Sequence, residues 1–155
     1  MKEHKGGNYG KFMLMLLLSF IAMYITMYLN TYEFNHVYFS LTRFYMTCLG
    51  IACMAVIMLS LMLGMYKNKK KNIAIYLGSL VLFVGALSLV RSQKPIGDVL
   101  YMKAMIPHHS IAIMTSKRAD IKDPETKKLA EEIIEAQKKE IAQMKKIIYR
   151  LEHAE

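Results

Sequence analysis

Residues 105–114 read MIPHHSIAIM and bring two adjacent histidines into one short stretch with a methionine at each end. A thioether sulfur is a soft metal ligand and an imidazole nitrogen an intermediate one, so the pair favours copper, with Cu(I) ahead of Cu(II). Zinc prefers cysteine, histidine and carboxylate ligands. Cysteine thiolates oxidise to disulfides outside the cytoplasm, and a site built from methionine and histidine avoids this oxidation. The stretch therefore raises the hypothesis of a copper site.

A helical projection shows which of these donors share a face. At about 100° per residue, Met102, Met105 and His109 fall within a sector about 60° wide, and His108 lies on its flank. Pro107 removes one backbone hydrogen bond, and we expect it to kink the helix just before the histidines. Such a kink would turn both imidazoles toward the methionines of the preceding turn.

The C-terminal stretch offers a matching face, where Gln137, Glu140 and Met144 have the spacing i, i+3, i+7. The first two interrupt a stripe that is otherwise apolar, and a polar group there needs a partner. A histidine N–H would be such a partner, and the contact would orient the histidine as a ligand. Alternatively, the methionines are ordinary core residues and the histidines are solvated. The predicted metal ligands are Met102, Met105, His108, His109 and Met144, supported by Gln137 and Glu140.

Two separated motifs resemble those of a known family. They are Met-x-x-His-His, at Met105, His108 and His109, and Gln-x-x-Glu-Ile-x-x-Met, at residues 137–144. Over about residues 96–147 this pattern resembles domain of unknown function 305, a ferritin-like helical family. The resemblance implies copper binding and copper tolerance, and some members carry N-terminal membrane spans. Many members have a methionine at the position of Thr115, and we expect Met102 to substitute for it here.

The same residues do not predict an enzyme. A diiron site of the ferritin-like type needs Glu-x-x-His pairs on its helices, and residues 98–155 contain none. Serine, histidine and acidic residues are present, but no spacing marks an activated nucleophile. We therefore expect no enzymatic activity.

Three apolar runs precede this region, at residues 12–29, 44–66 and 73–90. At about 1.5 Å per residue, a helix over each run reaches across a hydrocarbon core of about 30 Å. Too little polar sequence remains to cover three such helices in a soluble protein. We therefore predict an all-α protein with a membrane domain at residues 1–91, followed by a polar linker at 92–97.

The net charge of +9 does not indicate nucleic-acid binding, because the excess lies beside the apolar runs. Residues 1–96 hold ten Lys/Arg and two acids, whereas residues 97–155 hold eleven Lys/Arg and ten acids. One side of the predicted membrane has Lys2, Lys5, Lys11, Lys67, Lys69, Lys70 and Lys71, and the other has Arg43, Arg91 and Lys94. Short basic flanks stay cytoplasmic. We expect a multi-pass protein of the bacterial cytoplasmic membrane, with the N-terminus cytoplasmic and the C-terminal domain extracytoplasmic.

The C-terminal domain, residues 98–155, is predicted to contain two helices. The first runs from Asp98 to Arg118, and the second starts after Asp123, a favourable N-cap, with Pro124 at its first position. Two helices of this length make an antiparallel hairpin that buries one seam but no closed core. We therefore expect a homodimer in which two hairpins form a four-helix bundle.

These features predict a membrane-anchored extracytoplasmic copper-binding protein for copper sequestration, handling or tolerance. Its expected partners are the lipid bilayer, a second copy of the chain, and a copper-transport or copper-accepting protein. The alternative is a membrane-anchored structural or protein-interaction module that binds no metal. A further stripe, Met54, Met58, Met62 and Met65, either passes Cu(I) or is ordinary apolar packing, because methionine substitutes freely for leucine.

Overall fold

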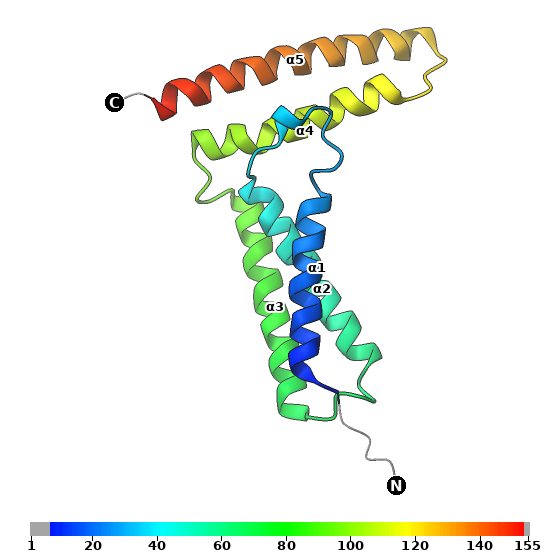
Figure 1. Ribbon diagram of the computed structural model, residues 1–155, viewed down its shortest axis with the longest axis vertical. Coiled ribbons are helices and arrows are strands. Elements are labelled where there is room, and N and C mark those ends of the chain that lie inside the picture. The colour runs from blue at the N-terminus through cyan, green and yellow to red at the C-terminus, as the bar shows by residue number, and fades with distance from the viewer. Residues whose placement is uncertain (1–6, 154–155) are drawn as a thin grey trace. The chain divides into compact units, whose positions relative to one another are not determined.

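The computed structural model describes residues 7–153, and every long regular element in that range is an α-helix (Figure 1). This confirms the all-α class. Lys2 and Lys5, which contribute to the orientation argument, lie outside the described residues. In chain order the elements are α1 (Tyr9–Thr26), the short 3-10 helix η1 (Phe34–His36), α2 (Leu41–Leu61), α3 (Lys69–Ser92), α4 (Asp98–Arg118) and α5 (Pro124–Glu152).

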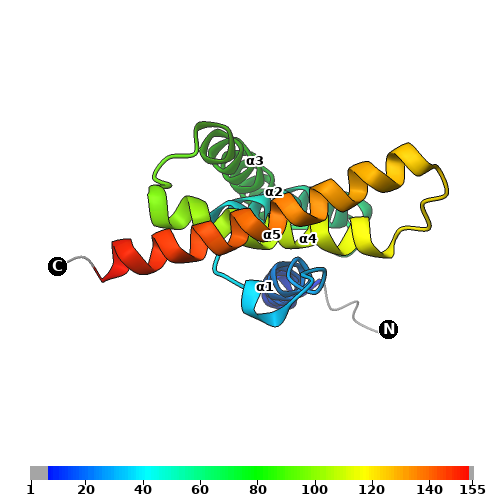
Figure 2. The same cartoon turned by 90° about the horizontal axis from the view of Figure 1, so that it is seen from above.

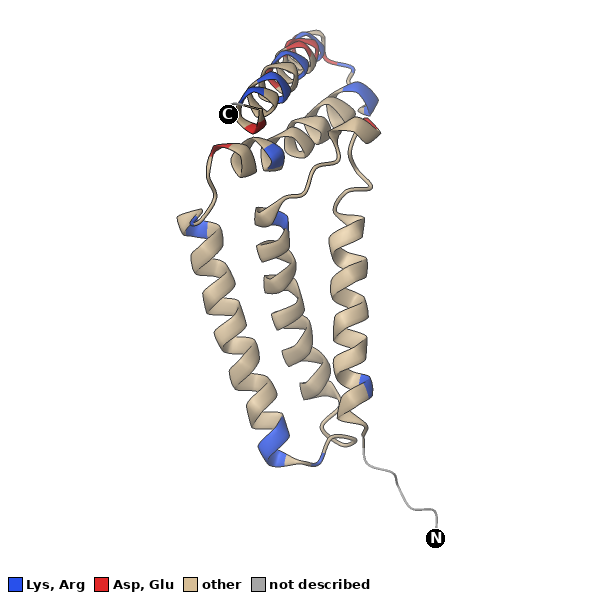
Figure 3. Cartoon of the chain, turned by 60° about the vertical axis from the view of Figure 1, so that its left-hand side comes forward, with Lys and Arg blue, Asp and Glu red and all other residues tan. Residues whose placement is uncertain are grey.

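The first three α-helices are apolar over almost their whole length. They contain 18, 21 and 24 residues, and the mean hydropathy of their most apolar stretches is 1.6, 2.1 and 2.4. Large apolar side chains point outward, as Leu17 and Val81 do with 55% and 72% of their surface exposed. Charged residues are confined to the ends of these helices (Figure 3). All three are therefore long and apolar enough to cross a membrane.

The ends of these helices differ from the ends of the apolar runs. α1 stops at Thr26 and α2 at Leu61, and the last residues of both runs form turns. α3 begins at Lys69, before its apolar run, because the Asn68 side chain caps it by accepting a hydrogen bond from the Lys71 N–H at 3.0 Å. Hydropathy thus locates the middle of each helix, whereas turns and caps set its ends.

The chain divides into two compact units, and the first contains α1 up to Ile25, α2 from Thr42 onward, and α3. A polar cluster fastens the start of α1 to the start of α3. The Tyr9 hydroxyl donates to Asn72 Oδ1 at 2.7 Å, and Asn72 Nδ2 donates to the Tyr66 carbonyl at 2.7 Å. The buried core of this unit is formed by Phe12, Leu16, Ile51, Ala55, Leu59 and Tyr66.

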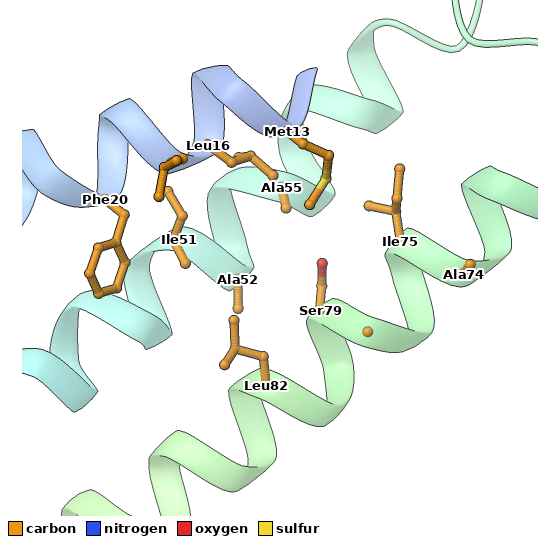
Figure 4. Close-up of a pocket in the computed structure, with 12 residues that line it drawn as sticks. Met13, Leu16, Phe20, Ile51, Ala52, Ala55, Ala74, Ile75, Ser79 and Leu82 are labelled. Atoms are coloured by element: carbon orange, nitrogen blue, oxygen red, sulfur yellow. The ribbon is translucent and has the colours of Figure 1, made fainter. Parts of the chain in front are cut away.

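An apolar cavity of about 480 Å³ lies between α1, α2 and α3 (Figure 4). Small residues such as Ala52 and Gly78 leave this space open. Ser79 supplies the one hydroxyl of its described lining, and Met13 the one thioether. The cavity therefore lacks the several donors that a metal ion requires.

The second unit joins residues 26–41 to the chain from Pro95 onward. Within it, α4 and α5 lie side by side and run in opposite directions (Figures 1 and 2). The domain boundary that we expected at residue 98 therefore leaves out part of this unit, because the connection between α1 and α2 folds with it. Its buried apolar core is formed by Met102, Ile106, Ile113, Ile141 and Ile148.

α5 begins as its sequence predicts. The Asp123 side chain accepts a hydrogen bond from the Thr126 N–H at 2.7 Å, and Pro124 occupies the first turn. This hydrogen bond holds the pKa of the Asp123 carboxyl below its usual value. The prediction of Asp123 as the N-cap is confirmed.

Candidate metal centre

α4 carries most of the predicted ligands and continues through Pro107 as one helix. The residues on both sides of this buried proline are helical, as expected for a single helix from Asp98 to Arg118. The expected kink at Pro107, where one backbone hydrogen bond is missing, stays a prediction. Met102 is buried, and Met105 and His109 follow on the same face, both partly exposed.

A groove of about 660 Å³ in the second unit brings predicted ligands of both helices together. Met102, Met105 and His109 line it from α4, and Met144 lines it from α5 together with Glu140. Three thioethers and one imidazole therefore border the same space. The other lining residues are Asp98, Tyr101, Gln143, Ile147, Arg150 and Leu151.

The imidazole of His109 lies against the carboxylate of Glu140. His109 Nδ1 is 3.5 Å from Glu140 Oε2, and the histidine side chain is 15% exposed. Burial lowers the pKa of His109; the Glu140 charge opposes this shift, and His108 adds to it. At neutral pH the ring is therefore neutral and retains one nitrogen lone pair.

Two buried polar atoms of this region lack a hydrogen-bond partner among the described residues, His109 Nδ1 and Gln137 Oε1. At 3.5 Å, Glu140 is close enough to orient an Nδ1–H group but is not bonded to it. If that nitrogen carries the ring proton, Nε2 keeps the lone pair that a metal needs. The surroundings of His109 therefore fit a metal-binding histidine.

Two of the predicted residues lie outside the groove. His108 is exposed, and its ring meets the His109 ring edge-on with the centroids 5.9 Å apart. Gln137 is partly buried on α5 but is not among the groove-lining residues. The flanking position of His108 agrees with the helical projection, and its ring is not turned into the groove.

Thr115, which stands where many family members have methionine, takes no part in the groove. Its hydroxyl donates to the carbonyls of Ile111 and Ala112 at 3.0 and 3.2 Å, and the side chain is exposed. Met102, which does line the groove, belongs to the opposite end of α4. Thr115 therefore supplies no donor to this space.

The donor set is dominated by sulfur. Within residues 7–153, no three His, Cys, Asp or Glu side chains gather closely enough to hold a metal ion. A metal in the groove would therefore depend on thioethers as well as on His109. This composition fits a soft ion such as Cu(I) and does not fit zinc, which would need more nitrogen, oxygen or thiolate ligands.

The connection between α1 and α2 contributes residues that sequence reasoning missed. His36 and Ser110 are both buried, and His36 Nδ1 lies 3.0 Å from Ser110 Oγ. The Tyr32 N–H donates to the same oxygen at 2.7 Å. Since Ser110 directly follows His109, the connection is fastened to the turn of α4 that carries the central imidazole of the groove.

Both ring nitrogens of His36 face polar groups. Nδ1 shares a hydrogen bond with Ser110 Oγ whose direction depends on the tautomer of the ring. His36 Nε2 is 3.7 Å from Glu33 Oε2. Burial lowers the pKa of His36, the charge of Lys145 lowers it further, and Glu33 raises it. His36 is therefore a neutral structural residue.

Two lysines hold the same connection from outside. Lys117 Nζ donates to the Tyr32 hydroxyl at 2.6 Å, and Lys145 Nζ donates to Asn35 Oδ1 at 3.0 Å. The one sequence signal for this region was the Glu-x-x-His spacing at residues 33–36. A single such pair on a 3-10 turn does not make a diiron site, which takes pairs from two helices.

Comparison with known proteins places this chain in a family. Residues 86–148 match a domain of unknown function (DUF305). An uncharacterized protein of Acanthamoeba polyphaga mimivirus is 35% identical over 144 residues, covering 91% of this chain and 93% of that protein. This chain belongs to the DUF305 family. No solved structure matches it.

The DUF305 match contains the whole of α4 and most of α5. It therefore includes every methionine and histidine that lines the groove. The similarity to the viral protein covers 91% of the chain and so extends into the apolar N-terminal helices. The predicted family is confirmed, and the stretch that carried the resemblance lies inside the matched range.

Proposed function

We propose that this DUF305 protein is a membrane-anchored copper-binding protein that holds Cu(I) in the groove between α4 and α5. The observation that carries the proposal is the convergence of Met102, Met105, His109 and Met144 on one space. Thioethers together with imidazole favour Cu(I) over Cu(II) and Zn(II). Donors from both helices would also make the bound ion a link between them.

The surroundings of these donors support binding and release rather than catalysis. Glu140 is positioned to orient His109, and Met102 is held in the apolar core. His108 is exposed beside His109, where it is accessible as an exchange ligand for a copper-transport or copper-accepting protein. The proposed role is therefore sequestration or delivery of copper, with no enzymatic activity.

The proposed location follows from α1, α2 and α3, which would cross the membrane. Lys11 and the lysines of residues 67–71 lie at one end of these helices, and Arg43, Arg91 and Lys94 at the other. The richer basic end would face the cytoplasm, so α4 and α5 would lie outside it. A bacterial membrane stays a prediction, and the viral relative indicates that the family is not confined to bacteria.

The proposed assembly is a homodimer in which two α4–α5 hairpins form a four-helix bundle. Exposed apolar residues on α5, Leu129, Tyr149 and Leu151, and Tyr101 on α4 support a protein contact. The same residues favour the alternative function, an interaction module without metal. The two functions differ in whether copper binds, so the copper measurement decides between them.

The test is a competition titration of the full chain in detergent with a Cu(I) indicator dye. His109→Ala is expected to weaken Cu(I) binding by at least about tenfold, because even the loss of an outer-shell partner of a metal ligand costs about 10–100-fold. Met144→Leu preserves packing volume and should weaken binding less. Met114→Leu is the matched control, because Met114 lies on α4 outside the groove lining. Wild-type affinity in the double variant His108→Ala, His109→Ala would overturn the copper function and favour the interaction module.

A further inference from the structure

A second series of soft donors lies in the membrane-spanning unit. Met54, Met58 and Met62 follow one another at intervals of four residues, and all three pack, partly buried, against the core shared by α1 and α2. Met62 is the first residue of the turn after α2, and Met65, the fourth member of the sequence stripe, lies later in that turn and is 53% exposed. The buried series therefore stops at Met62.

Met23 of α1 extends this series by one turn. Its Sδ lies 2.9 Å from the position that a Cβ atom on Gly50 would occupy. Gly50 precedes Met54 by four residues on α2. Position 50 is where the series, continued by one turn toward the N-terminus of α2, would have its next methionine. Glycine has no side chain there, so the Met23 sulfur lies close to the α2 backbone at that position.

The spacing suits transfer of an ion from one sulfur to the next. Neighbouring positions of the series are roughly 6 Å apart along the helix, and the Cβ atoms of i,i+4 residues are about 5–6 Å apart. Methionine has three flexible side-chain bonds, so two adjacent sulfurs can reach one ion. From Gly50 to Met62 the series spans roughly 18 Å of a hydrocarbon core of about 30 Å.

We propose that Met23, Met54, Met58 and Met62 form a thioether ladder that carries Cu(I) along the α1–α2 contact through the membrane. This inference rests on the proposed copper function. Each step exchanges one Cu–S bond for the next without a change of oxidation state. A bare charge is costly inside the membrane, and continuous thioether ligation lowers that cost for a soft univalent ion. The apolar cavity of Figure 4, with one thioether in its described lining, offers no such series.

The test measures Cu(I) flux into vesicles that contain the full chain. Copper is kept reduced with ascorbate outside, and a membrane-impermeant Cu(I)-binding dye reports arrival inside. The triple variant Met54→Leu, Met58→Leu, Met62→Leu keeps the packing volume and should lower flux by at least about tenfold. The matched control, Met46→Leu with Met65→Leu, replaces two methionines that are 45% and 53% exposed. Its flux should equal that of the wild type.

Gly50→Ala tests the geometry without removing a donor. The new Cβ would meet Met23 Sδ at 2.9 Å, and the flexible end of that side chain can move aside while the helices stay packed. We expect a severalfold loss of flux with unchanged helix content by circular dichroism. Flux at the wild-type level would show that the Met23 sulfur is not part of the ladder.

The indicator titration of the groove, made on the same samples, separates this inference from the proposed function. The triple variant should bind Cu(I) in the groove with wild-type affinity while its flux is lost. Either of two results would overturn the ladder and leave the groove proposal intact. The triple variant could show wild-type flux, or vesicles with the wild-type protein could be no more permeable to Cu(I) than protein-free vesicles. If the wild-type groove binds no Cu(I), the copper function itself is overturned.

Discussion

His109 and His36 show how surroundings give one residue type two roles. Burial lowers the pKa of both, so both rings are neutral at physiological pH. His36 is enclosed, and its Nδ1 is engaged by Ser110. His109 is partly exposed in a groove among thioethers, with a carboxylate beside Nδ1. Of these two histidines, His109 is the one that combines a free lone pair with access for an ion.

The lowered pKa of His109 predicts how copper binding depends on pH. Protons compete with Cu(I) for the imidazole only when the ring protonates, which here happens below the usual value of 6.5. A plot of log affinity from indicator titrations against pH should bend at the pKa of the His109 imidazole, which lies below 6.5. The free energy of unfolding should also decrease as the pH falls below 6.5, because the unfolded chain takes up the proton first. A bend above pH 6.5 would contradict the assignment.

The buried His36–Ser110 contact predicts a stability effect. His36→Ala would remove the hydrogen bond that Ser110 Oγ shares with His36 Nδ1, and an unsatisfied buried polar group costs about 1–3 kcal/mol. Chemical denaturation of the full chain should show this loss of unfolding free energy. Asn35→Ala, which removes only an exposed hydrogen bond to Lys145, is the control and should change stability little. Equal stability of both variants would mean that the contact does not hold the connection to α4.

For the helices, the sequence predicts which residues share a face of α4 better than it predicts which distant residues pack against that helix. The projection that grouped Met102, Met105 and His109 agrees with the groove, because helical periodicity depends only on local geometry. The contact of His36 with Ser110 joins residues 74 positions apart, and no periodic pattern encodes such a distance. The single helix from Asp98 to Arg118 was predicted correctly although it contains Pro107, which removes one backbone hydrogen bond.

The α4–α5 pair determines which mutations can probe dimerisation. Ile141 is 3% exposed and already buried within one chain, so Ile141→Asp would damage the single hairpin rather than report on a dimer. Ile141→Ala is expected to cost about 2–5 kcal/mol of unfolding free energy, as for other buried Ile→Ala changes. Leu129→Ala, at a site 56% exposed, should change it by less than about 0.5 kcal/mol. If thermal or chemical melts show the reverse order, the assignment of the helix-pair core is wrong.

For the whole molecule, hydropathy predicts three apolar helices and a helical C-terminal region, because burial in lipid or core needs only composition and period. It does not predict that residues 26–41 fold with the C-terminal unit, since polar contacts such as Tyr32 to Ser110 fasten them. Copper measurements should therefore use the full chain. A fragment that starts at residue 96 would lack His36 and the contacts that hold Ser110 next to His109.

The lysine distribution predicts the orientation of the whole molecule. A reporter fused after Glu155 that is active only outside the cytoplasm should be active, because Lys11 and the lysines of residues 67–71 mark the opposite side as cytoplasmic. The control replaces the lysines of 67–71 with glutamine and should weaken this preference. A reporter that is active only in the cytoplasm would contradict both the orientation and the argument that the site avoids thiolates for redox reasons.

The central claim is that sulfur and nitrogen donors of the α4–α5 groove hold Cu(I), and X-ray absorption at the copper edge of the loaded full chain tests it most directly. The spectrum should show sulfur and nitrogen neighbours together. Met144→Leu should reduce the sulfur contribution, and His109→Ala should reduce the nitrogen contribution. A copper ion surrounded only by nitrogen and oxygen, or a spectrum unchanged in both variants, would contradict the claim.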